Sequence, residues 1–449
     1  MSEERKIFLE GEEGPVAIAK RARAAARSLA VLPSEKKDEI LRSVADGLDA
    51  ARDVILEANR ADVLEARTTF KEIPSSSSSR SLLDRLVLDG EKVRAMSAGV
   101  RAVAALPDPS GRILSRTLLD DGLVLEKVSC PIGVLLVVFE SRPDAVPQIA
   151  SLALKSGNAA ILKGGRESAR STAAILDVFT GVYAEHAVPE GALQSVGGRA
   201  DVDALLALDG EIDLVIPRGG YDLVKHVMAN TRIPVLGHAE GVCHVYVDRA
   251  ADEAMATAIV LDAKLQYPAA CNAAETLLVH REAAAKFLVP LLTKLGDAGV
   301  ELRACEGTRA FAPALALSPA TEDDWRAEYG APVLAVKIVE SLDEAVEHVN
   351  RYSSHHTEAI VTDDPSAAEA FLARVDAAGV FHNASTRFAD GFRYGFGAEV
   401  GVSTSRLHAR GPVGLEGLVT YKYVLRGSGQ VVATYSGKGA RPFRHEPLP

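Results

Sequence analysis

The feature that most constrains the fold is an alternation of short apolar runs with helix-length segments. It begins at residue 132 and continues to about residue 382. The first pair is the apolar run 132–139 followed by the helical segment 145–155, and the second half of the chain repeats this arrangement. Strands that alternate with helices of this length are typical of parallel sheets, because each helix provides the crossover between parallel neighbours. The sequence therefore predicts doubly wound α/β structure in two successive units.

Different patterns flank the alternation. Residues 15–66 and 82–100 carry apolar residues at helical spacing, which predicts helices ahead of the first strand. A β-hairpin is predicted between residues 111 and 129, because two apolar runs there are separated by Asp120-Asp121-Gly122. The edges of such a hairpin need a partner in the same chain or in another subunit. Late strands are predicted at 418–424 and 430–433.

Composition and charge exclude several classes of protein. The 449 residues are 47% hydrophobic, so wholesale disorder is not expected, and a net charge of −11 disfavours a broad nucleic-acid or anionic-membrane surface. The longest apolar run, 132–139, is far shorter than the roughly 20 residues of a membrane span. The N-terminus has no apolar signal segment, and the four cysteines are not spaced as metal ligands. We expect a cytoplasmic protein without a bound metal.

Cys271 is the candidate nucleophile. It follows Pro268-Ala269-Ala270 and precedes the apolar run 277–279, so nothing bulky beside it in the sequence blocks approach to the thiol. The thiolate is the reactive form of cysteine, and nearby charge or a helix terminus decides how much of it is present. The alternative interpretation is a buried small hydrophobe, which is the commoner fate of an isolated cysteine.

Two basic, glycine-containing turns follow predicted strands. Lys163-Gly164-Gly165-Arg166 stands after the strand 159–162, and Arg218-Gly219-Gly220 stands after the strand 214–216. Glycine lets backbone N–H groups approach an anion, and the helix that follows adds its dipole to the side-chain charge. Either turn alone is equally compatible with solvated surface charges. Two such turns at strand ends of one sheet favour a dinucleotide.

Together these residues resemble the gamma-glutamyl phosphate reductases, also called glutamate-5-semialdehyde dehydrogenases, of the aldehyde dehydrogenase superfamily. The resemblance runs from about residue 15 to about residue 430, and its details are closest to the reductase half of the delta-1-pyrroline-5-carboxylate synthases. It is carried by Cys271-Asn272 with Glu275-Thr276-Leu277-Leu278, Phe139-Glu140-Ser141-Arg142-Pro143, Ile216-Pro217-Arg218-Gly219, Asn383-Ala384-Ser385-Thr386-Arg387-Phe388, Gly397-Ala398-Glu399-Val400 and His408-Ala409-Arg410-Gly411-Pro412.

The resemblance implies an α/β, aldehyde dehydrogenase-like fold with a Rossmann-type cofactor domain, an α/β catalytic domain and a small β oligomerisation flap. It also implies reduction of L-glutamyl 5-phosphate by NADPH to L-glutamate 5-semialdehyde, with release of phosphate, in proline biosynthesis. The expected assembly is a homodimer or tetramer, and a glutamate kinase is a candidate partner. The expected segments are 1–110 and 130–240 for NADP binding, 241–405 for catalysis, 111–129 and 406–436 for the flap, and 437–449 as a flexible tail.

Site residues follow from the same resemblance. Cys271 is implied to attack the acyl phosphate and form a thioester. Arg166 stands three residues after Lys163, where NAD-preferring relatives often carry an acid, so it favours a 2′-phosphate and hence NADPH. Oxyanion or substrate contacts are implied for Ser141, Arg142, Asn272, Asn383, Ser385 and Arg387. Cofactor contacts are implied for Lys163, Gly165, Arg166, Arg218, Gly219, Gly220 and Glu328.

Some of these assignments have alternatives. Relatives carry an asparagine at the position matching Ser141, each arginine has a structural ion pair as its alternative, and Glu328 has the alternative of a surface residue on a loop. Gly237 stands where hydrolytic relatives carry a general base, and we assign the nearby Glu240 no catalytic role. His355-His356 resembles a metal pair only superficially, because adjacent residues of a strand point to opposite faces.

Three rival functions remain at this point. The first is a hydrolytic aldehyde dehydrogenase that acts on another small acidic aldehyde, against which the missing base argues. The second is a cysteine acyltransferase or hydrolase without a nicotinamide cofactor, against which the two basic turns argue. The third is a non-catalytic scaffold that binds a glutamate kinase, and the intact Cys271 motif argues against it.

Overall fold

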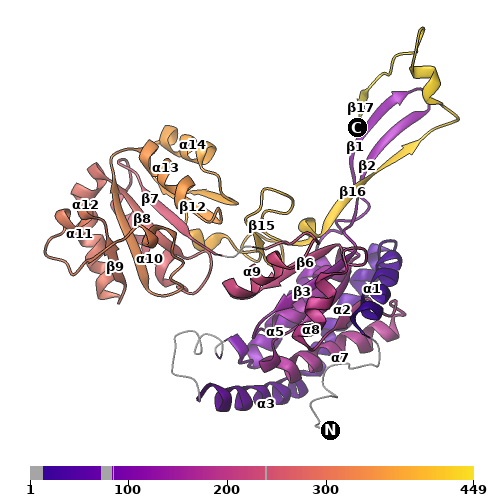
Figure 1. Cartoon of the computed structure of the whole chain (residues 1–449), viewed down its shortest axis with the longest axis horizontal. Helices are drawn as coiled ribbons and strands as arrows, with labels where there is room; N and C mark the ends of the chain where they lie inside the picture. The colour runs from indigo at the N-terminus through magenta and orange to yellow at the C-terminus, as the bar shows by residue number, and fades with distance from the viewer. Residues whose placement is uncertain (1–13, 72–82, 84, 238–239) are drawn as a thin grey trace.

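The computed structural model describes residues 14–71, 83, 85–237 and 240–449. The N-terminal segment, in which we saw no signal peptide, lies outside the described residues. Figure 1 shows two α/β units side by side, with a β-sheet flap projecting from one of them. This is the aldehyde dehydrogenase-like arrangement that the sequence predicted.

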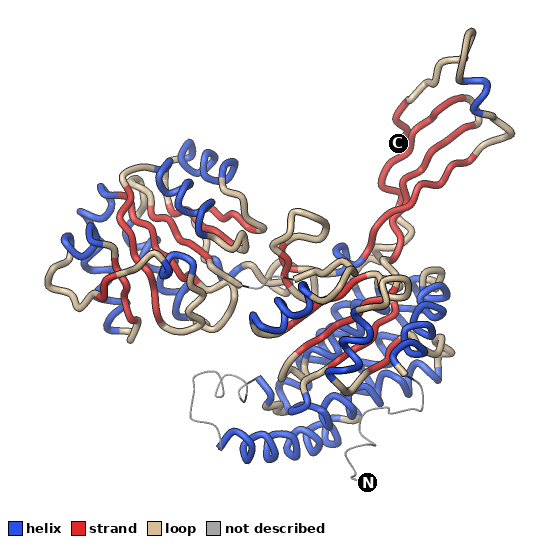
Figure 2. The backbone as a smooth tube through the Cα atoms, viewed as in Figure 1, coloured by secondary structure: helices blue, strands red, loops and turns tan. Residues whose placement is uncertain are grey.

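The first unit is a parallel sheet of order β5-β4-β3-β6. Its central strand β3 is apolar and wholly buried, because helices cover both faces of the sheet (Figure 2). The chain order reverses between β3 and β6, and ligands of such sheets bind at this switch point. The strands are β3 (Val134–Phe139), β4 (Ala159–Lys163), β5 (Leu193–Ser195) and β6 (Leu214–Arg218). The helices are α1 (Pro15–Leu29), α2 (Ser34–Ala50), α3 (Arg52–Lys71), α5 (Gly90–Ala105), α6 (Ala145–Lys155), α7 (Ala169–Glu185), α8 (Arg199–Leu206) and α9 (Tyr221–Ala229).

The second unit is a parallel sheet of order β10-β9-β11-β8-β7-β12-β13. Alternate residues of its strands enter different cores: Val245 and Val247 pack in the core that α10 and α11 share, whereas Tyr246 packs with α13 and α14. The strands are β7 (Cys243–Val247), β8 (Ala274–His280), β9 (Glu301–Ala304), β10 (Ser318–Pro319), β11 (Val333–Val339), β12 (Thr357–Val361) and β13 (Gly379–His382). The helices are α10 (Glu253–Leu265), α11 (Arg281–Asp297), α12 (Glu306–Phe311), α13 (Leu342–Tyr352) and α14 (Pro365–Arg374).

The flap is an antiparallel sheet of order β16-β2-β1-β17. Its β1 (Ile113–Asp120) and β2 (Leu123–Pro131) form the predicted hairpin, and β16 (Val419–Arg426) pairs with β2 along its whole length. The hairpin and the first of the predicted late strands therefore belong to one sheet.

Two predictions for the C-terminal segment are wrong. Residues 430–433 do not form the predicted strand, since the chain there passes into the short 3-10 helix η6 (Val432–Tyr435). The tail 437–449 was expected to be flexible, but β17 (Glu446–Leu448) pairs with β1 in antiparallel register. The tail returns because the outer edge of β1 otherwise presents unpaired backbone groups.

The chain also leaves the second unit earlier than expected. We placed the end of the catalytic segment at residue 405, but Ala398 and Val400 are buried in the core of the first unit, as are Val413 and Leu418. Between them, β14 (Val402–Ser403) pairs with β15 (Gly411–Pro412). The segment before β16 is thus built onto the first unit by its apolar residues.

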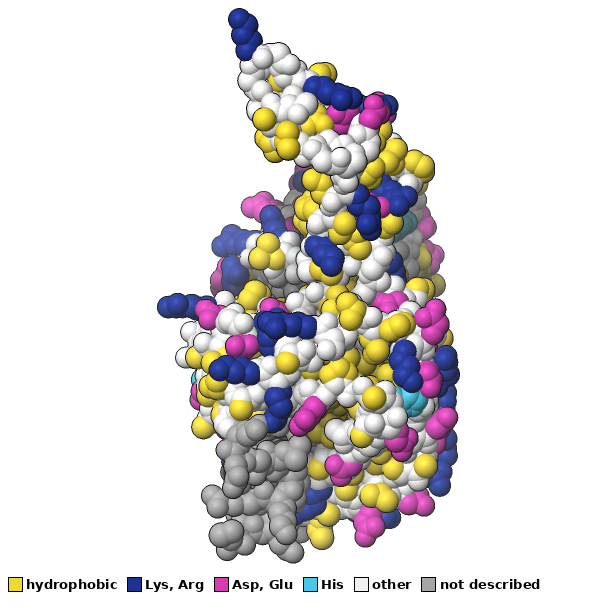
Figure 3. Space-filling model, turned by 90° about the vertical axis from the view of Figure 1, so that its right-hand side faces the viewer, with side chains coloured by type: hydrophobic (Ala, Val, Ile, Leu, Met, Phe, Trp, Pro, Cys, Tyr) yellow, Lys and Arg dark blue, Asp and Glu magenta, His cyan; other side chains and the backbone are white. Residues whose placement is uncertain are grey.

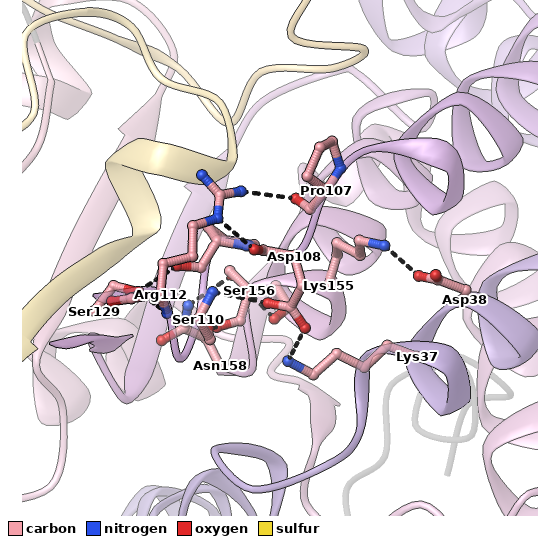
Figure 4. A network of polar contacts seen from close by, with 12 residues as sticks. Lys37, Asp38, Pro107, Asp108, Ser110, Arg112, Ser129, Lys155, Ser156 and Asn158 are labelled. Atoms are coloured by element: carbon pink, nitrogen blue, oxygen red, sulfur yellow. Dashed lines mark hydrogen bonds and ion pairs between the residues drawn. The ribbon is translucent and has the colours of Figure 1, made fainter. Parts of the chain in front are cut away.

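A polar network anchors the base of the flap to the first unit (Figure 4). Lys37 and Lys155 are fully buried, and each binds a carboxylate: Lys37 Nζ lies 2.8 Å from Asp108 Oδ2, and Lys155 binds Asp38. Buried ammonium groups are tolerated only with such partners. The network continues into the flap through Arg112, whose Nε donates to the Asp108 carbonyl at 2.7 Å.

Asn158 of the same network joins three chain segments, and its loss is expected to destabilise the protein. Its Oδ1 accepts from the Gly133 N–H at 2.7 Å, and its Nδ2 donates to the Leu418 carbonyl at 2.8 Å and to Ser156 Oγ at 2.7 Å. In Asn158→Ala these buried groups lose their partner, so we expect the unfolding free energy in urea to fall by about 3 kcal/mol. Asn230→Ala removes an exposed asparagine and serves as control. An equal loss in both variants would contradict the expectation.

Candidate functional site

A cavity of about 380 Å³ lies where the two α/β units meet. We call it the thiol cavity, because Cys271 lines it. The sequence-predicted site residues that line it are Arg142, Arg218, Gly219, Gly220, Cys271, Asn272, Glu328 and Arg387. Those that do not line it are Ser141, Lys163, Gly165, Arg166, Asn383 and Ser385. The structure thus brings together residues from both units and from widely separated parts of the sequence.

Cys271 lies in the turn between α10 and β8, and its backbone is tightly enclosed. A Cβ on Gly241 would lie 2.1 Å from the Cys271 carbonyl oxygen, so only glycine allows the segment before β7 to pass here. The thiol of Cys243 donates to the same carbonyl at 3.4 Å. The side chain of Cys271 stays half-buried and faces the cavity. Gly241 and Cys243 therefore hold the backbone of Cys271 in place, while its thiol faces the cavity in which a substrate fits.

The Cys271 thiol contacts a histidine that sequence reasoning had set aside. His356 Nε2 lies 3.3 Å from Cys271 Sγ, and His356 Nδ1 lies 2.8 Å from Thr357 Oγ1. His356 is buried, whereas the adjacent His355 turns away and contacts Asp376 instead. No sequence signal connects two residues this far apart in the chain, because only the pairing of β7 with β8 and β12 brings them together.

The cavity is also lined by four arginines. None of the four forms an ion pair with the residues that the structure describes, although four carboxylates line the same space. Each carboxylate instead accepts a backbone N–H: Glu140 from Gly220 at 2.9 Å, Glu328 from Gly241 at 2.9 Å, Glu399 from Gly391 at 2.9 Å and Asp390 from Phe392 at 3.0 Å. The guanidinium groups thus remain available to an anion. The four arginines are Arg85, Arg142, Arg218 and Arg387.

Burial changes the pKa of two of these arginines. It lowers the pKa of Arg218, and it lowers the pKa of Arg387. Arg218 Nη1 donates to the Glu399 carbonyl at 3.3 Å, and Arg387 Nε donates to Gln266 Oε1 at 2.9 Å. A buried cation with neutral partners gains from a bound anion, because the anion replaces the lost hydration.

Known proteins with similar sequences and structures belong to the family that the motifs resemble. The aldehyde dehydrogenase family model matches residues 129–304 and 303–422. A gamma-glutamyl phosphate reductase of a Synechococcus species is 55% identical over 94% of this chain and 92% of its own length. A second, of Methanococcoides burtonii, is 50% identical over 95% of each chain. The crystal structure of gamma-glutamyl phosphate reductase from Thermotoga maritima is 41% identical, with a TM-score of 0.88 over 93% of this chain and 100% of that one.

The chain belongs to the gamma-glutamyl phosphate reductases. Enzymes of this family are oxidoreductases of proline biosynthesis that reduce glutamyl phosphate to glutamate semialdehyde. This confirms the resemblance that the motifs carried, and it makes the thiol cavity the candidate active site of a family member.

A second set of predicted residues lies at the carboxyl ends of β3, β4 and β6 in this reductase fold. Lys163 ends β4, Arg166 begins the 3-10 helix η2 (Arg166–Ser168) that follows it, and Arg218 ends β6. Glu140, to which we assigned no role, follows β3 beside them. A Cβ on Gly219 would lie 2.4 Å from Glu140 Oε2 and 2.7 Å from Leu223 Cδ2, so a larger residue there would require these side chains to move. Burial lowers the pKa of Lys163, while the carboxylates of Glu167 and Glu140 oppose the shift.

Ser141, Asn383 and Ser385 have local partners instead of facing the thiol cavity. The N–H and hydroxyl of the buried Ser141 both donate to Glu167, which binds the hydroxyl that we expected at the oxyanion. Asn383 makes two hydrogen bonds to the backbone of Thr362, at 2.9 and 3.0 Å. Ser385 accepts from the Arg387 N–H at the start of η4 (Thr386–Phe388). These geometries give the three residues structural contacts.

Asn272 and Glu328 also have structural partners, although both line the cavity. Asn272 Nδ2 donates to the Ala389 carbonyl at 2.7 Å, while its buried Oδ1 has no partner among the described residues. Glu328 is exposed and accepts from Gly241 beside Cys271. Glu240, to which we assigned no role, is exposed and does not line the cavity.

Sequence reasoning missed several residues of the cavity. Arg85 comes from the helical N-terminal region, where no motif at a strand end indicates a site. Its buried Nε has no partner among the described residues. Tyr267, Asp390 and Glu399 lie within or beside recognised motifs but carried no assigned role. The described residues contain no cluster of acidic, histidine or cysteine side chains that could hold a metal ion. Nor does this part of the chain contain a helix long and apolar enough to cross a membrane.

Proposed function

We propose that this chain reduces L-glutamyl 5-phosphate with NADPH through a thioester on Cys271. The observation that carries the proposal is a thiol at the edge of a cavity whose four arginines form no ion pair with the described residues. An acyl phosphate with a free carboxylate brings negative charge at both ends, and unpaired guanidinium groups select such a ligand over an uncharged aldehyde.

The chain's own residues supply nucleophile and charge. Cys271 Sγ attacks the acyl carbon, the bond from that carbon to the phosphate oxygen breaks, and phosphate leaves with the electron pair. Arginines such as Arg142 and Arg218 stabilise the dianion as it forms. Collapse of the reduced intermediate breaks the C–S bond, releases the aldehyde and restores the thiol. Since phosphate is the leaving group, no residue has to activate a water molecule.

The strand ends of the first unit fit a dinucleotide. Gly219 and Gly220 follow β6 at the switch point with β3, and the cations Lys163, Arg166 and Arg218 lie along the same sheet edge. When bound there, the nicotinamide supplies the hydride that reduces the thioester. The exposed Arg166, in place of an acid, favours the 2′-phosphate of NADPH over the ribose hydroxyls of NADH.

Arg142 is expected to bind an anionic part of the substrate. It lines the thiol cavity, and its guanidinium makes no hydrogen bond or ion pair with the described residues. A charge-assisted hydrogen bond lost to Arg142→Met corresponds to about 1.5–3 kcal/mol, so we expect kcat/KM for the acyl phosphate to fall about 10- to 100-fold. Arg406→Met removes an exposed arginine bound to Asp376 and serves as control. Equal kinetics of both variants would show that Arg142 does not touch the substrate.

The proposed reaction is best tested in reverse. Glutamate semialdehyde, in equilibrium with its cyclic imine, is mixed with the protein and NADP⁺, with and without phosphate, and nicotinamide absorbance is followed. We expect NADPH formation only with phosphate, and slower turnover with NAD⁺. Turnover without phosphate would favour hydrolytic chemistry. No turnover of the folded protein in either direction would exclude the reductase function.

The flap supports a further part of the proposal, homo-oligomerisation. Its edge strand β16 exposes Tyr421, Tyr423 and Leu425, and Figure 3 shows hydrophobic side chains along the projecting flap. An edge strand with an apolar face is a template for pairing, and symmetric self-association is the commonest solution. Light scattering after size-exclusion chromatography tests it, because a monomer at micromolar concentration would contradict this role.

A further inference from the structure

We propose that His356 is a further catalytic residue, the proton acceptor and charge partner of the Cys271 thiol. The inference rests on the role proposed above for Cys271 as nucleophile. His356 Nε2 lies 3.3 Å from Cys271 Sγ, which is hydrogen-bond distance for sulfur. An imidazole that close takes up the thiol proton and leaves the nucleophilic thiolate beside an imidazolium.

The ring of His356 is held in the orientation that this role requires. Its Nδ1 lies 2.8 Å from Thr357 Oγ1, and only 1% of the residue is exposed, so the ring cannot turn toward water. The Gly379 N–H donates to the His356 carbonyl at 3.0 Å and fixes the backbone at the start of β12. With the Nδ1–H donated to Thr357, the lone pair of Nε2 faces the thiol.

The charged groups around the pair favour the thiolate. Arg218 at the end of β6 and Arg387 in η4 are the nearby cations that interact with the thiol, and Glu399 is the acid that opposes them. Cys243 on β7 lies behind the nucleophile, and burial raises the pKa of its thiol well above the ordinary value. Cys243 therefore stays protonated, and Cys271 is the thiol that His356 can ionise.

The proton balance follows from this arrangement. The proton moves from Sγ to Nε2 before attack and remains on the imidazole while the thioester exists. Phosphate departs with the electrons of the broken C–O bond and takes its proton from water. When the C–S bond breaks, the returning thiolate is again paired with the imidazolium. His356 thus lowers the barrier of thioester formation and stabilises the leaving thiolate at the end.

Alkylation of Cys271 by iodoacetamide tests the pair without substrate or cofactor. The rate is measured by mass spectrometry of the Cys271 peptide between about pH 5 and 9 for wild type, His356→Gln and the matched control His355→Asn. In wild type and control we expect an inflection clearly below about 8.5, the ordinary pKa of cysteine. In His356→Gln the inflection moves up toward that value, and the rate near neutral pH falls about 10-fold or more.

Three results would overturn the proposal. They are an unchanged profile in His356→Gln, a change of equal size in His355→Asn, and a wild-type inflection at the ordinary cysteine value. The wild-type inflection at the ordinary value would overturn the proposal even if His356→Gln does not fold. Thr357→Val, which removes the hydroxyl partner of Nδ1, should give an intermediate shift. Turnover is measured separately, with a loss in kcat of about 100-fold expected in His356→Gln and little change in KM. Failure of turnover in wild type with an intact alkylation shift would refute the reaction and leave the pair standing.

Discussion

Replacing Cys271 by alanine is expected to lower phosphate-dependent turnover by at least about 10⁴-fold, because a covalent route without its nucleophile has no substitute in the cavity. Cys243 cannot take over, since it is fully buried and burial raises the pKa of its thiol. Cys271→Ser is expected to be almost as inactive, because a serine hydroxyl is hardly ionised near neutral pH. Both variants replace a small half-buried side chain in a turn, so they should keep the wild-type unfolding midpoint.

The matched control for this experiment is Cys130→Ser. Cys130 is also half-buried, but it lies in β2 of the flap, and burial raises the pKa of its thiol. Its replacement should leave turnover unchanged. Cofactor binding, followed through fluorescence of Trp325, the single tryptophan, should persist in Cys271→Ala. Residual activity of that variant within about 100-fold of wild type would mean that another group attacks the acyl phosphate.

The parts of the fold that the sequence predicted are those set by local pattern. The run 134–139 reads as a buried strand because every side chain in it is apolar, and a strand covered on both faces requires that. The flap hairpin was readable from its turn residues. The return of the tail onto β1 was not readable, because β17 is short and its pairing depends on the exposed edge of a distant strand.

The candidate site divides in the same way. Arg218 ends β6 and Gly219 follows it, where a parallel sheet presents ligands, so their positions were predictable in kind. Cys271 was predictable from its small-residue turn ahead of β8. The contact of His356 with the thiol arises because β12 and β8 lie on either side of β7. No local sequence pattern predicts that strand order. Ser141 shows the converse case. Its position in a motif indicated an oxyanion donor, but its N–H and hydroxyl both donate to Glu167, which follows the next strand, β4.

Beneath the nucleophile turn lies a buried ion pair that the proposed mechanism does not use directly, although its acid, Glu275, belongs to the Cys271 motif. Lys264 at the end of α10 and Glu275 in β8 are fully buried, with Nζ 2.6 Å from Oε2. They flank the turn that carries Cys271, and Glu275 Oε1 also accepts from the Gly330 N–H at 3.2 Å. Burial raises the pKa of Glu275 to about 7, and it lowers the pKa of Lys264. Burial therefore disfavours the charged form of both side chains beneath the turn, and each charge is stabilised by the other.

Lys264→Met is accordingly expected to lower the unfolding free energy by about 3–5 kcal/mol, because it leaves Glu275 buried without its partner. A carboxyl whose folded pKa lies above its unfolded value of 4.5 contributes stability that is fully present below pH 4.5 and is lost as the pH rises through about 7. Removing the ammonium raises the folded pKa further. The deficit of Lys264→Met should therefore be larger above pH 7 than near pH 5, as measured by urea denaturation across that range.

Two further variants separate the pair from general packing. Lys337→Met breaks the partly exposed pair with Glu344, whose atoms are 3.0 Å apart, and should cost no more than about 1 kcal/mol. The double variant Lys264→Met with Glu275→Leu removes both charges, so it should recover much of the stability and lose the pH dependence. If the double variant were as unstable as Lys264→Met, the loss would come from altered packing beneath the turn. If the double variant instead recovers stability and reacts with iodoacetamide at Cys271 as fast as wild type, the turn requires well-packed, uncharged side chains beneath it, and the ion pair itself is not required.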